Sequence, residues 1–228
     1  NANSISNVEK LTKDQLLLIK DNVSFLNKIN NSNVSLILAI DSSNSQNNSK
    51  KVFDSKKISI ETFINTISNS NKNITVGLVV WNTKLNNTTS IPLTTDFVKL
   101  KEQVALIQAN GNTCLGVGLQ AAKKMIDDDE NKGKKYIIYI SDGIEEYCDK
   151  PVEICSMARD IRNSRITIYT IGKKDSAGNL SCISGPTNFF DLNEVSFDDA
   201  LQKISTHVLG DSNKGNVNSD RNDTLIND

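Results

Sequence analysis

Histidine is almost absent from this chain of 228 residues, and His207 is its single example. Zinc and copper sites rely on histidine and cysteine ligands, and none of the four cysteines stands in a C-x-x-C pair. A Ser-His-Asp or Cys-His nucleophile needs an imidazole base, and His207 lies in the stretch expected to form the closing helix. The scarcity of histidine therefore argues against a soft-metal site and against nucleophilic catalysis.

An excess of charge of one sign and long apolar runs are also missing. The 26 basic and 27 acidic residues leave a formal net charge of -1, so no overall field attracts nucleic acid or an anionic membrane. The apolar runs are too short to span a bilayer, and we expect no direct membrane insertion by this chain. It begins with Asn1 and shows no signal sequence, so we expect a trimmed or processed piece whose anchor has been removed.

Short aliphatic runs alternate with helical patterns along most of the chain. Residues 34–40 form one such run and residues 136–140 another, and both are typical of strands that are buried on both faces of a parallel sheet. Residues 88–93 include Pro92, which favours an edge strand. We therefore predict an α/β fold with a doubly wound, mostly parallel central sheet, helices on both faces and one short antiparallel edge strand.

The pattern divides the chain into three parts. Residues 34–209 contain the alternating strands and helices and are long enough to form one domain with a sizeable core. Residues 1–33 are interpreted as a polar segment followed by an amphipathic helix. Residues 210–228 are rich in Asn and Asp and nearly devoid of apolar residues, so we predict a flexible polar tail or linker.

Oxygen-bearing side chains follow the ends of two predicted strands. Asp41, Ser43 and Ser45 come after the first strand, and Asp142 follows the strand that ends at residue 140. Ligands of open α/β sheets bind beyond the carboxyl ends of the strands, so these side chains can share one crevice. Thr113, on another loop, can supply a further hydroxyl. Hydroxyl and carboxylate oxygens suit hard cations such as Mg²⁺, Ca²⁺ or Mn²⁺.

This set of residues resembles the metal-ion-dependent adhesion site, or MIDAS, of von Willebrand factor A domains. The matching motifs are the D-x-S-x-S sequence that begins at Asp41, the Gly-Asn-Thr sequence that ends at Thr113, and the Ser-Asp-Gly sequence around Asp142. The resemblance covers roughly residues 34–209. It implies that the serine and threonine hydroxyls coordinate the ion directly and that the aspartates act largely through water. Mg²⁺ is the expected cation, with Ca²⁺ and Mn²⁺ as alternatives.

Further residues are assigned to the rim of this site. Asn44 and Asn112 stand where the family often has glycine, and asparagine tolerates left-handed backbone better than other residues with a β-carbon. Gly143, Glu145 and Glu146 follow the second aspartate, and the two glutamates can set the charge that a partner meets.

The resemblance implies a binding module for adhesion or assembly, with no catalysis. The cation would hold a carboxylate of a protein or of another acidic partner. One alternative is an intracellular assembly factor of the same fold that partners an AAA-type ATPase. Another is a metal-dependent hydrolase, because a cation beside carboxylates can activate water. The hydrolase has no evident general base other than the aspartates of the site and the neighbouring glutamates.

Cysteine usage indicates the cellular compartment. The loop after Asp142 is similar to Asp-Gly-x-Glu-x-Cys loops in secreted or periplasmic bacterial and archaeal members of the family, and this similarity implies a disulfide between Cys148 and Cys155. The alternative is two free thiols in a reducing cell. Cys114 and Cys182 can pair or stay buried, and the sequence leaves both possibilities open. Disulfides persist in oxidising compartments, so we expect an extracellular, cell-surface or periplasmic protein.

One motif suggests a different ligand. Residues 116–121 match the dinucleotide-binding pattern G-x-G-x-x-A. No strand is predicted directly before them, although that pattern requires one. We therefore interpret the two glycines as positions where a helix packs closely.

Overall fold

The computed structural model describes residues 13, 17, 20, 33–47, 50–70, 72–83, 88–142, 153–174 and 179–210. Its strands and α-helices are, in chain order, β1 (Val34–Asp41), α2 (Lys50–Ser68), β2 (Ile74–Trp81), β3 (Thr89–Thr94), α3 (Phe97–Ala105), α4 (Leu115–Asp127), β4 (Lys134–Ile140), α5 (Ile154–Asn163), β5 (Ile166–Gly172), α6 (Asn179–Ser184), β6 (Phe189–Asp191) and α7 (Phe197–Gly210). Short 3-10 helices occur at η1 (Asn44–Asn47) and η3 (Pro186–Asn188).

The predicted terminal segments are mostly outside the described residues. Within the expected N-terminal helix, Lys13, Leu17 and Lys20 have helical backbone and are exposed. The predicted tail after residue 210 lies outside the described residues. In the part of the chain that the structure describes, no helix combines the length and the apolar character needed to cross a membrane.

The described residues form one six-stranded sheet with the order β3-β2-β1-β4-β5-β6. All neighbouring pairs from β2 to β6 are parallel. β3 pairs antiparallel with β2 at one edge, where the missing N–H of Pro92 is tolerated. The predicted doubly wound, mostly parallel sheet with one antiparallel edge strand is therefore confirmed.

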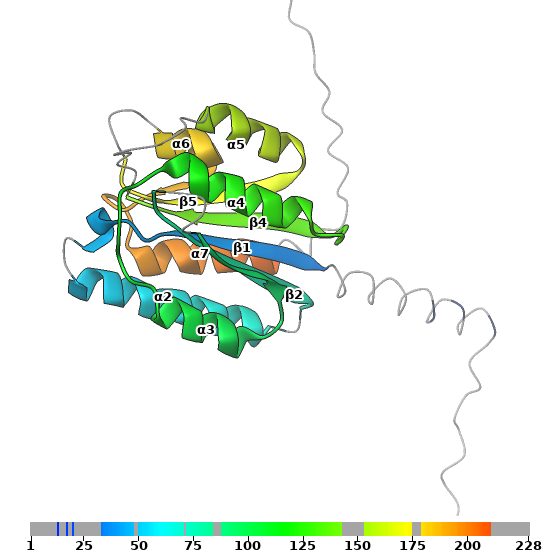
Figure 1. Cartoon of the computed structure of the whole chain (residues 1–228). Coiled ribbons are helices and arrows are strands. Elements are labelled where there is room, and N and C mark those ends of the chain that lie inside the picture. The colour runs from blue at the N-terminus through cyan, green and yellow to red at the C-terminus, as the bar shows by residue number, and fades with distance from the viewer. Residues whose placement is uncertain are drawn as a thin grey trace, which may run out of the picture.

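Helices cover both faces of this sheet (Figure 1). Helices α2, α3 and α7 pack on one face, against a buried cluster that includes Leu36, Leu38 and Ile40 of β1. Helices α4, α5 and α6 pack on the other face, against Ile37 and Ala39 of the same strand. Because successive side chains of a strand point to opposite faces, β1 contributes to both cores and is buried at every position.

Helix α4 approaches the sheet closely at Gly118. A β-carbon at this position would lie 2.2 Å from ring atoms of Trp81. The Trp81 side chain is fully buried and stacks on Tyr139, with ring centroids 5.3 Å apart. This contact agrees with the interpretation of the G-x-G motif as a helix-packing feature.

The site residues lie at one end of the sheet, and the described chain enters β1 and leaves α7 at the other. The carboxyl ends of β1 and β4 lie together, and they carry Asp41 and the residues that follow Ile140. The described chain enters β1 at the opposite end of the sheet. Helix α7 runs back from Phe197 toward that opposite end and finishes there at Gly210 (Figure 1).

Candidate metal centre

The D-x-S-x-S segment turns away from the sheet at the end of β1. Asp41 is the last residue of β1, Ser43 lies in the turn that follows, and Ser45 lies in η1. The turn is held by the Asp41 carboxylate, because its Oδ1 accepts a 2.8 Å hydrogen bond from the backbone N–H of Ser43. Asp41 and Ser43 are buried, whereas Ser45 is partly exposed.

Three hydroxyl groups from two loops meet beside this turn. Ser43 Oγ lies 2.8 Å from Ser45 Oγ, and Thr113 Oγ1 donates a 2.8 Å hydrogen bond to Ser43 Oγ. Ser43 and Thr113 are 70 positions apart in the sequence. The topology of the domain therefore brings together the three hydroxyl groups that the motif assigns as direct ligands.

The Asp41 carboxylate is surrounded by hydrogen-bond donors. Its Oδ2 accepts a 2.7 Å bond from Ser141 Oγ and a longer, 3.4 Å bond from Gln46 Nε2. Burial raises the pKa of Asp41 to about 6. The hydrogen bonds from Ser141 and Ser43 oppose that rise, and the negative charge of Asp142 adds to it. A cation bound here would offset the free-energy cost of burying this charge.

Asp142 lies at the same carboxyl end of the sheet, two residues after β4. Its Oδ1 is buried and has no hydrogen-bond partner among the described residues. A buried carboxylate oxygen without a partner is costly, because it has lost its hydration without replacement. A hard cation or its coordinated waters would satisfy such an oxygen.

The residues present thus fit a divalent cation bound by oxygen. The described ranges contain no cluster of three or more His, Cys, Asp or Glu side chains that could hold a metal ion. The oxygen ligands on offer are the hydroxyl groups of Ser43, Ser45 and Thr113 and the carboxylates of Asp41 and Asp142. If the hydroxyl groups made the direct contacts, these neutral ligands would leave much of the positive charge of the ion available to a further, acidic ligand.

Two side chains near the site were not predicted from the sequence. Lys56, on α2, donates a 2.9 Å hydrogen bond to Gln46 Oε1, and Gln46 in turn reaches Asp41. Burial lowers the pKa of Lys56, the charges of Asp142 and Asp41 raise it, and the charge of Lys173 lowers it. A glutamine after the motif and a lysine on the next helix are common features, so neither carried a specific signal.

Backbone hydrogen bonds join the loop of Thr113 to the first loop. The Asn110 N–H donates to the Ser42 carbonyl over 2.7 Å, and the Asn44 N–H donates to the Gly111 carbonyl over 2.8 Å. Gly111 has a φ of +75°, in the left-handed region that favours glycine. These contacts fix the position of Thr113 relative to the two serines.

The rim asparagines Asn44 and Asn112 do not use left-handed backbone, so their tolerance of it is not called upon here. Among the described residues with a β-carbon, only Arg165 has a positive φ. Asn44 begins η1, and the Asn112 N–H donates a 2.8 Å hydrogen bond to Thr83 Oγ1. Both asparagines are exposed, and they occupy ordinary backbone conformations. The other predicted rim residues lie outside the described residues: Gly143, Glu145 and Glu146.

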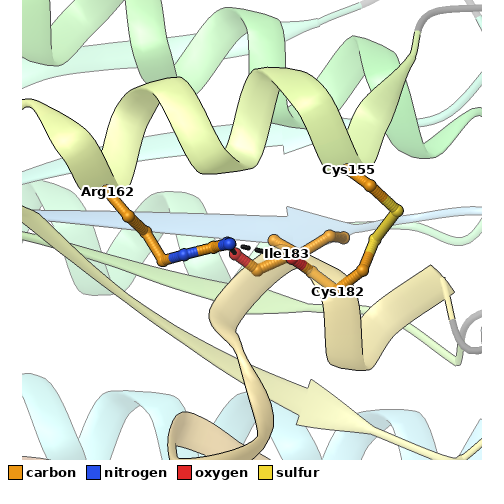
Figure 2. Close-up of a disulfide and its surroundings, with 4 residues drawn as sticks. All are labelled: Cys155, Arg162, Cys182 and Ile183. Carbon is orange, nitrogen blue, oxygen red and sulfur yellow. Dashed lines mark hydrogen bonds between the residues drawn. A yellow bond between two sulfur atoms is a disulfide. The ribbon is translucent and has the colours of Figure 1, made fainter.

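The disulfide implied by the family resemblance is wrong. Cys155 bonds to Cys182, with Cα atoms 5.3 Å apart (Figure 2), and Cys148 lies outside the described residues. The pairing follows from packing, because Cys155 is in the first turn of α5, Cys182 is in α6, and these helices contact each other. Arg162 of α5 strengthens this contact by donating to the carbonyl oxygens of Cys182 and of the next residue. Cys114 is also disulfide-bonded, so it is not the partner of Cys182.

The sequence and the fold were compared with known proteins. Residues 36–145 match the family model described as the von Willebrand factor type A domain. None of the curated proteins matches this chain significantly.

Many solved structures are similar in fold, and three of them show the likeness to this chain. The pilus adhesin SpaC from Lactobacillus rhamnosus GG, in an open conformation, has 15% sequence identity and a TM-score of 0.63. The alignment covers 80% of this chain and 30% of SpaC, so the chain spans less than a third of that relative. The vWF domain of the type V pili tip protein Mfa5 from Porphyromonas gingivalis has 14% identity and a TM-score of 0.69, with 82% and 99% of the two chains covered.

The third structure is proximal thread matrix protein 1 from the mussel byssus, described with a zinc-occupied MIDAS motif. It has 16% identity and a TM-score of 0.58, and the alignment covers 77% of this chain and 46% of that chain. At these identities the likeness shows the fold. The described domain has the fold of a von Willebrand factor type A domain.

Proposed function

We propose that this von Willebrand factor type A domain is a divalent-cation-dependent protein-binding module for adhesion or assembly, with no catalytic activity. One observation carries the proposal. The hydroxyl groups of Ser45 and Thr113 both contact that of Ser43, at the carboxyl end of the sheet, where a buried oxygen of Asp142 has no partner among the described residues. This set of oxygens suits Mg²⁺, with Ca²⁺ and Mn²⁺ as alternatives.

The five residues would have two kinds of role. Ser43, Ser45 and Thr113 would bind the ion directly, as the family resemblance implies. Asp41 and Asp142 would hold its coordinated waters and supply compensating charge. The ion would supply an electrophilic position, and a carboxylate from a partner would complete its coordination with a charge-assisted contact.

The comparisons and the disulfide support a role outside the cytoplasm. SpaC is described as a pilus adhesin and Mfa5 as a pilus tip protein, and the mussel protein is described with a metal in its MIDAS motif. The Cys155–Cys182 disulfide suits an oxidising compartment. We therefore place the domain at the cell surface, outside the cell or in the periplasm, in preference to an intracellular partner of an ATPase.

Replacing Thr113 with alanine tests the metal site. We expect Thr113→Ala to weaken Mg²⁺ binding at least tenfold, about 1.4 kcal/mol, because one of three direct ligands is lost. Isothermal titration calorimetry measures this change, and circular dichroism should show an unchanged fold.

The matched control for this experiment is Thr66→Ala, on the exposed face of α2. It should bind Mg²⁺ as the unmodified protein does. The proposal fails if Thr113→Ala and the unmodified protein bind Mg²⁺ equally, or if the unmodified protein binds none.

A further inference from the structure

A cavity of about 760 Å³ adjoins the candidate metal centre. Ser45 and Asp142 belong to both, so a ligand held at the cation would extend directly into this space. Gln46 and Lys56, which form the hydrogen-bonded link to Asp41, also line it. The cavity is therefore the immediate surroundings of any group bound to the ion.

Three lysines give one part of this cavity a positive charge. Lys56 comes from α2, and Lys173 and Lys174 directly follow β5. None of the three forms an ion pair among the described residues. Lys173 and Lys174 are exposed, and the backbone N–H of Lys174 donates a 3.2 Å hydrogen bond to Asp191 Oδ1, which fixes the chain at this point.

The charges of Lys56 and Lys173 are close enough to act on one another. Burial lowers the pKa of Lys56, the charges of Asp142 and Asp41 oppose that effect, and repulsion from Lys173 adds to it. Two carboxylates, Asp142 of the candidate metal centre and Asp198, also line the cavity, and neither makes an ion pair with the three lysines in the described structure. An anionic group entering from solvent would therefore meet unpaired positive charge.

An apolar wall lies in the same cavity. Its residues are Leu192, Val195 and Phe197 around the start of α7, together with Val52 of α2. Val52 is 54% exposed, so its side chain is open to a ligand in this cavity. Lys56 Nζ lies 6.0 Å from the centre of the Phe197 ring, so the apolar and positive parts of the cavity are in contact.

We propose that the partner is an acidic peptide segment with two carboxylates that flank an apolar side chain. One carboxylate would complete the coordination of the cation, the apolar side chain would cover the wall at Val195 and Phe197, and the second carboxylate would pair with Lys173 or Lys174. This inference rests on the proposed function of the metal centre and adds to it the class of ligand. The apolar wall favours a peptide over an acidic polysaccharide, because sugar rings offer hydroxyl groups where this wall has no partner for them.

Three blocked peptides test this inference in solution: acetyl-Glu-Leu-Glu-amide, acetyl-Glu-Leu-Gln-amide and acetyl-Gln-Leu-Glu-amide. In excess Mg²⁺, NMR titration of the isotope-labelled chain should show the di-acidic peptide binding about fivefold tighter than either mono-acidic peptide, as one exposed ion pair allows. This advantage should shrink as salt is added, since exposed charges are screened.

Neutralising the two exposed lysines should remove the advantage. In Lys173→Gln/Lys174→Gln, we expect the di-acidic peptide to bind no tighter than the mono-acidic peptides, whose affinities stay unchanged. The matched control is Lys99→Gln/Lys101→Gln on α3, which removes the same charge away from the cavity and should keep the advantage.

The outcomes separate this inference from the proposed function. If the di-acidic advantage is absent, or survives in Lys173→Gln/Lys174→Gln, the lysine subsite is wrong while Mg²⁺ binding that Thr113→Ala weakens still supports the metal centre. If Thr113→Ala leaves both Mg²⁺ and peptide binding unchanged, the metal centre itself is wrong. Failure of all three peptides to bind at about 10 mM overturns the peptide assignment.

Discussion

Lys56 places a positive charge next to a site that would bind a dication. Its ammonium group bonds to Gln46 and acts on Asp41 and Asp142 through space. Repulsion between this charge and a bound ion would lower cation affinity, since like charges interact strongly in a partly buried site. The same charge would attract an acidic partner. Lys56 would therefore weaken the binding of the cation and strengthen the binding of the acidic partner.

The first prediction at this scale follows from that repulsion. Lys56→Gln should raise Mg²⁺ affinity by roughly three- to tenfold, because the positive charge is removed while a side chain able to bond Gln46 remains. Calorimetric titration with Mg²⁺ measures the change. Lys51→Gln, an exposed position on the same helix, is the control and should leave the affinity unaltered. A lower affinity in Lys56→Gln would show that its hydrogen bond matters more than its charge.

A second prediction concerns Gly118, where α4 contacts Trp81. Gly118→Ala should destabilise the protein by about 1–2 kcal/mol, because the added β-carbon would overlap a fully buried ring, and this cost exceeds the gain in helix propensity. Urea unfolding followed by circular dichroism measures the loss. Gly210→Ala, where a β-carbon meets nothing within 4 Å, is the matched control and should not lower stability. Equal stability of the two variants would contradict the packing argument.

At the scale of elements, the disulfide joins α5 to α6 on the face of the sheet that α4 also covers. Cys155 and Cys182 are 27 positions apart. Removing a bridge that closes a loop of this length should cost about 3.5 kcal/mol in the chain-entropy model. We expect Cys155→Ala/Cys182→Ala to lower the free energy of unfolding by this amount, measured by urea unfolding. The Mg²⁺ affinity should change far less. An unchanged unfolding midpoint would show that packing and Arg162 alone hold the two helices.

The sequence was sufficient to predict the elements that depend on local pattern. The apolar run that became β1 is buried at every position, and Pro92 is on the antiparallel edge strand, as expected. Such features are encoded by neighbours along the chain, so hydrophobic pattern and proline chemistry predict them.

Contacts between distant elements were harder to predict. The pairing of Cys155 depends on how α5 packs against α6, and spacing along the chain cannot supply that information. The link from Lys56 through Gln46 to Asp41 likewise needs a helix placed beside the first loop. The motif did identify the three hydroxyl residues that the fold brings into contact, because residue type and position at a strand end were both informative.

For the whole molecule, cation binding and folding should be coupled. An ion that binds only the folded domain stabilises it by mass action, by about 2.7 kcal/mol when its concentration is one hundred times the Kd. We expect Mg²⁺ to raise the free energy of unfolding by this amount, and a chelator to reverse the gain. Thr113→Ala should show little gain at the same concentration. An equal gain in that variant would mean that the ion binds elsewhere on the domain.

The direction of the chain through the domain bears on how the site is presented. The described residues enter β1 and leave α7 at the same end of the sheet, and the candidate metal centre is at the other end (Figure 1). A linker attached at either of those two points would anchor the domain at that end of the sheet and leave the end with the candidate metal centre exposed. Such a layout suits outward display, in which a ligand can approach head-on without passing the support.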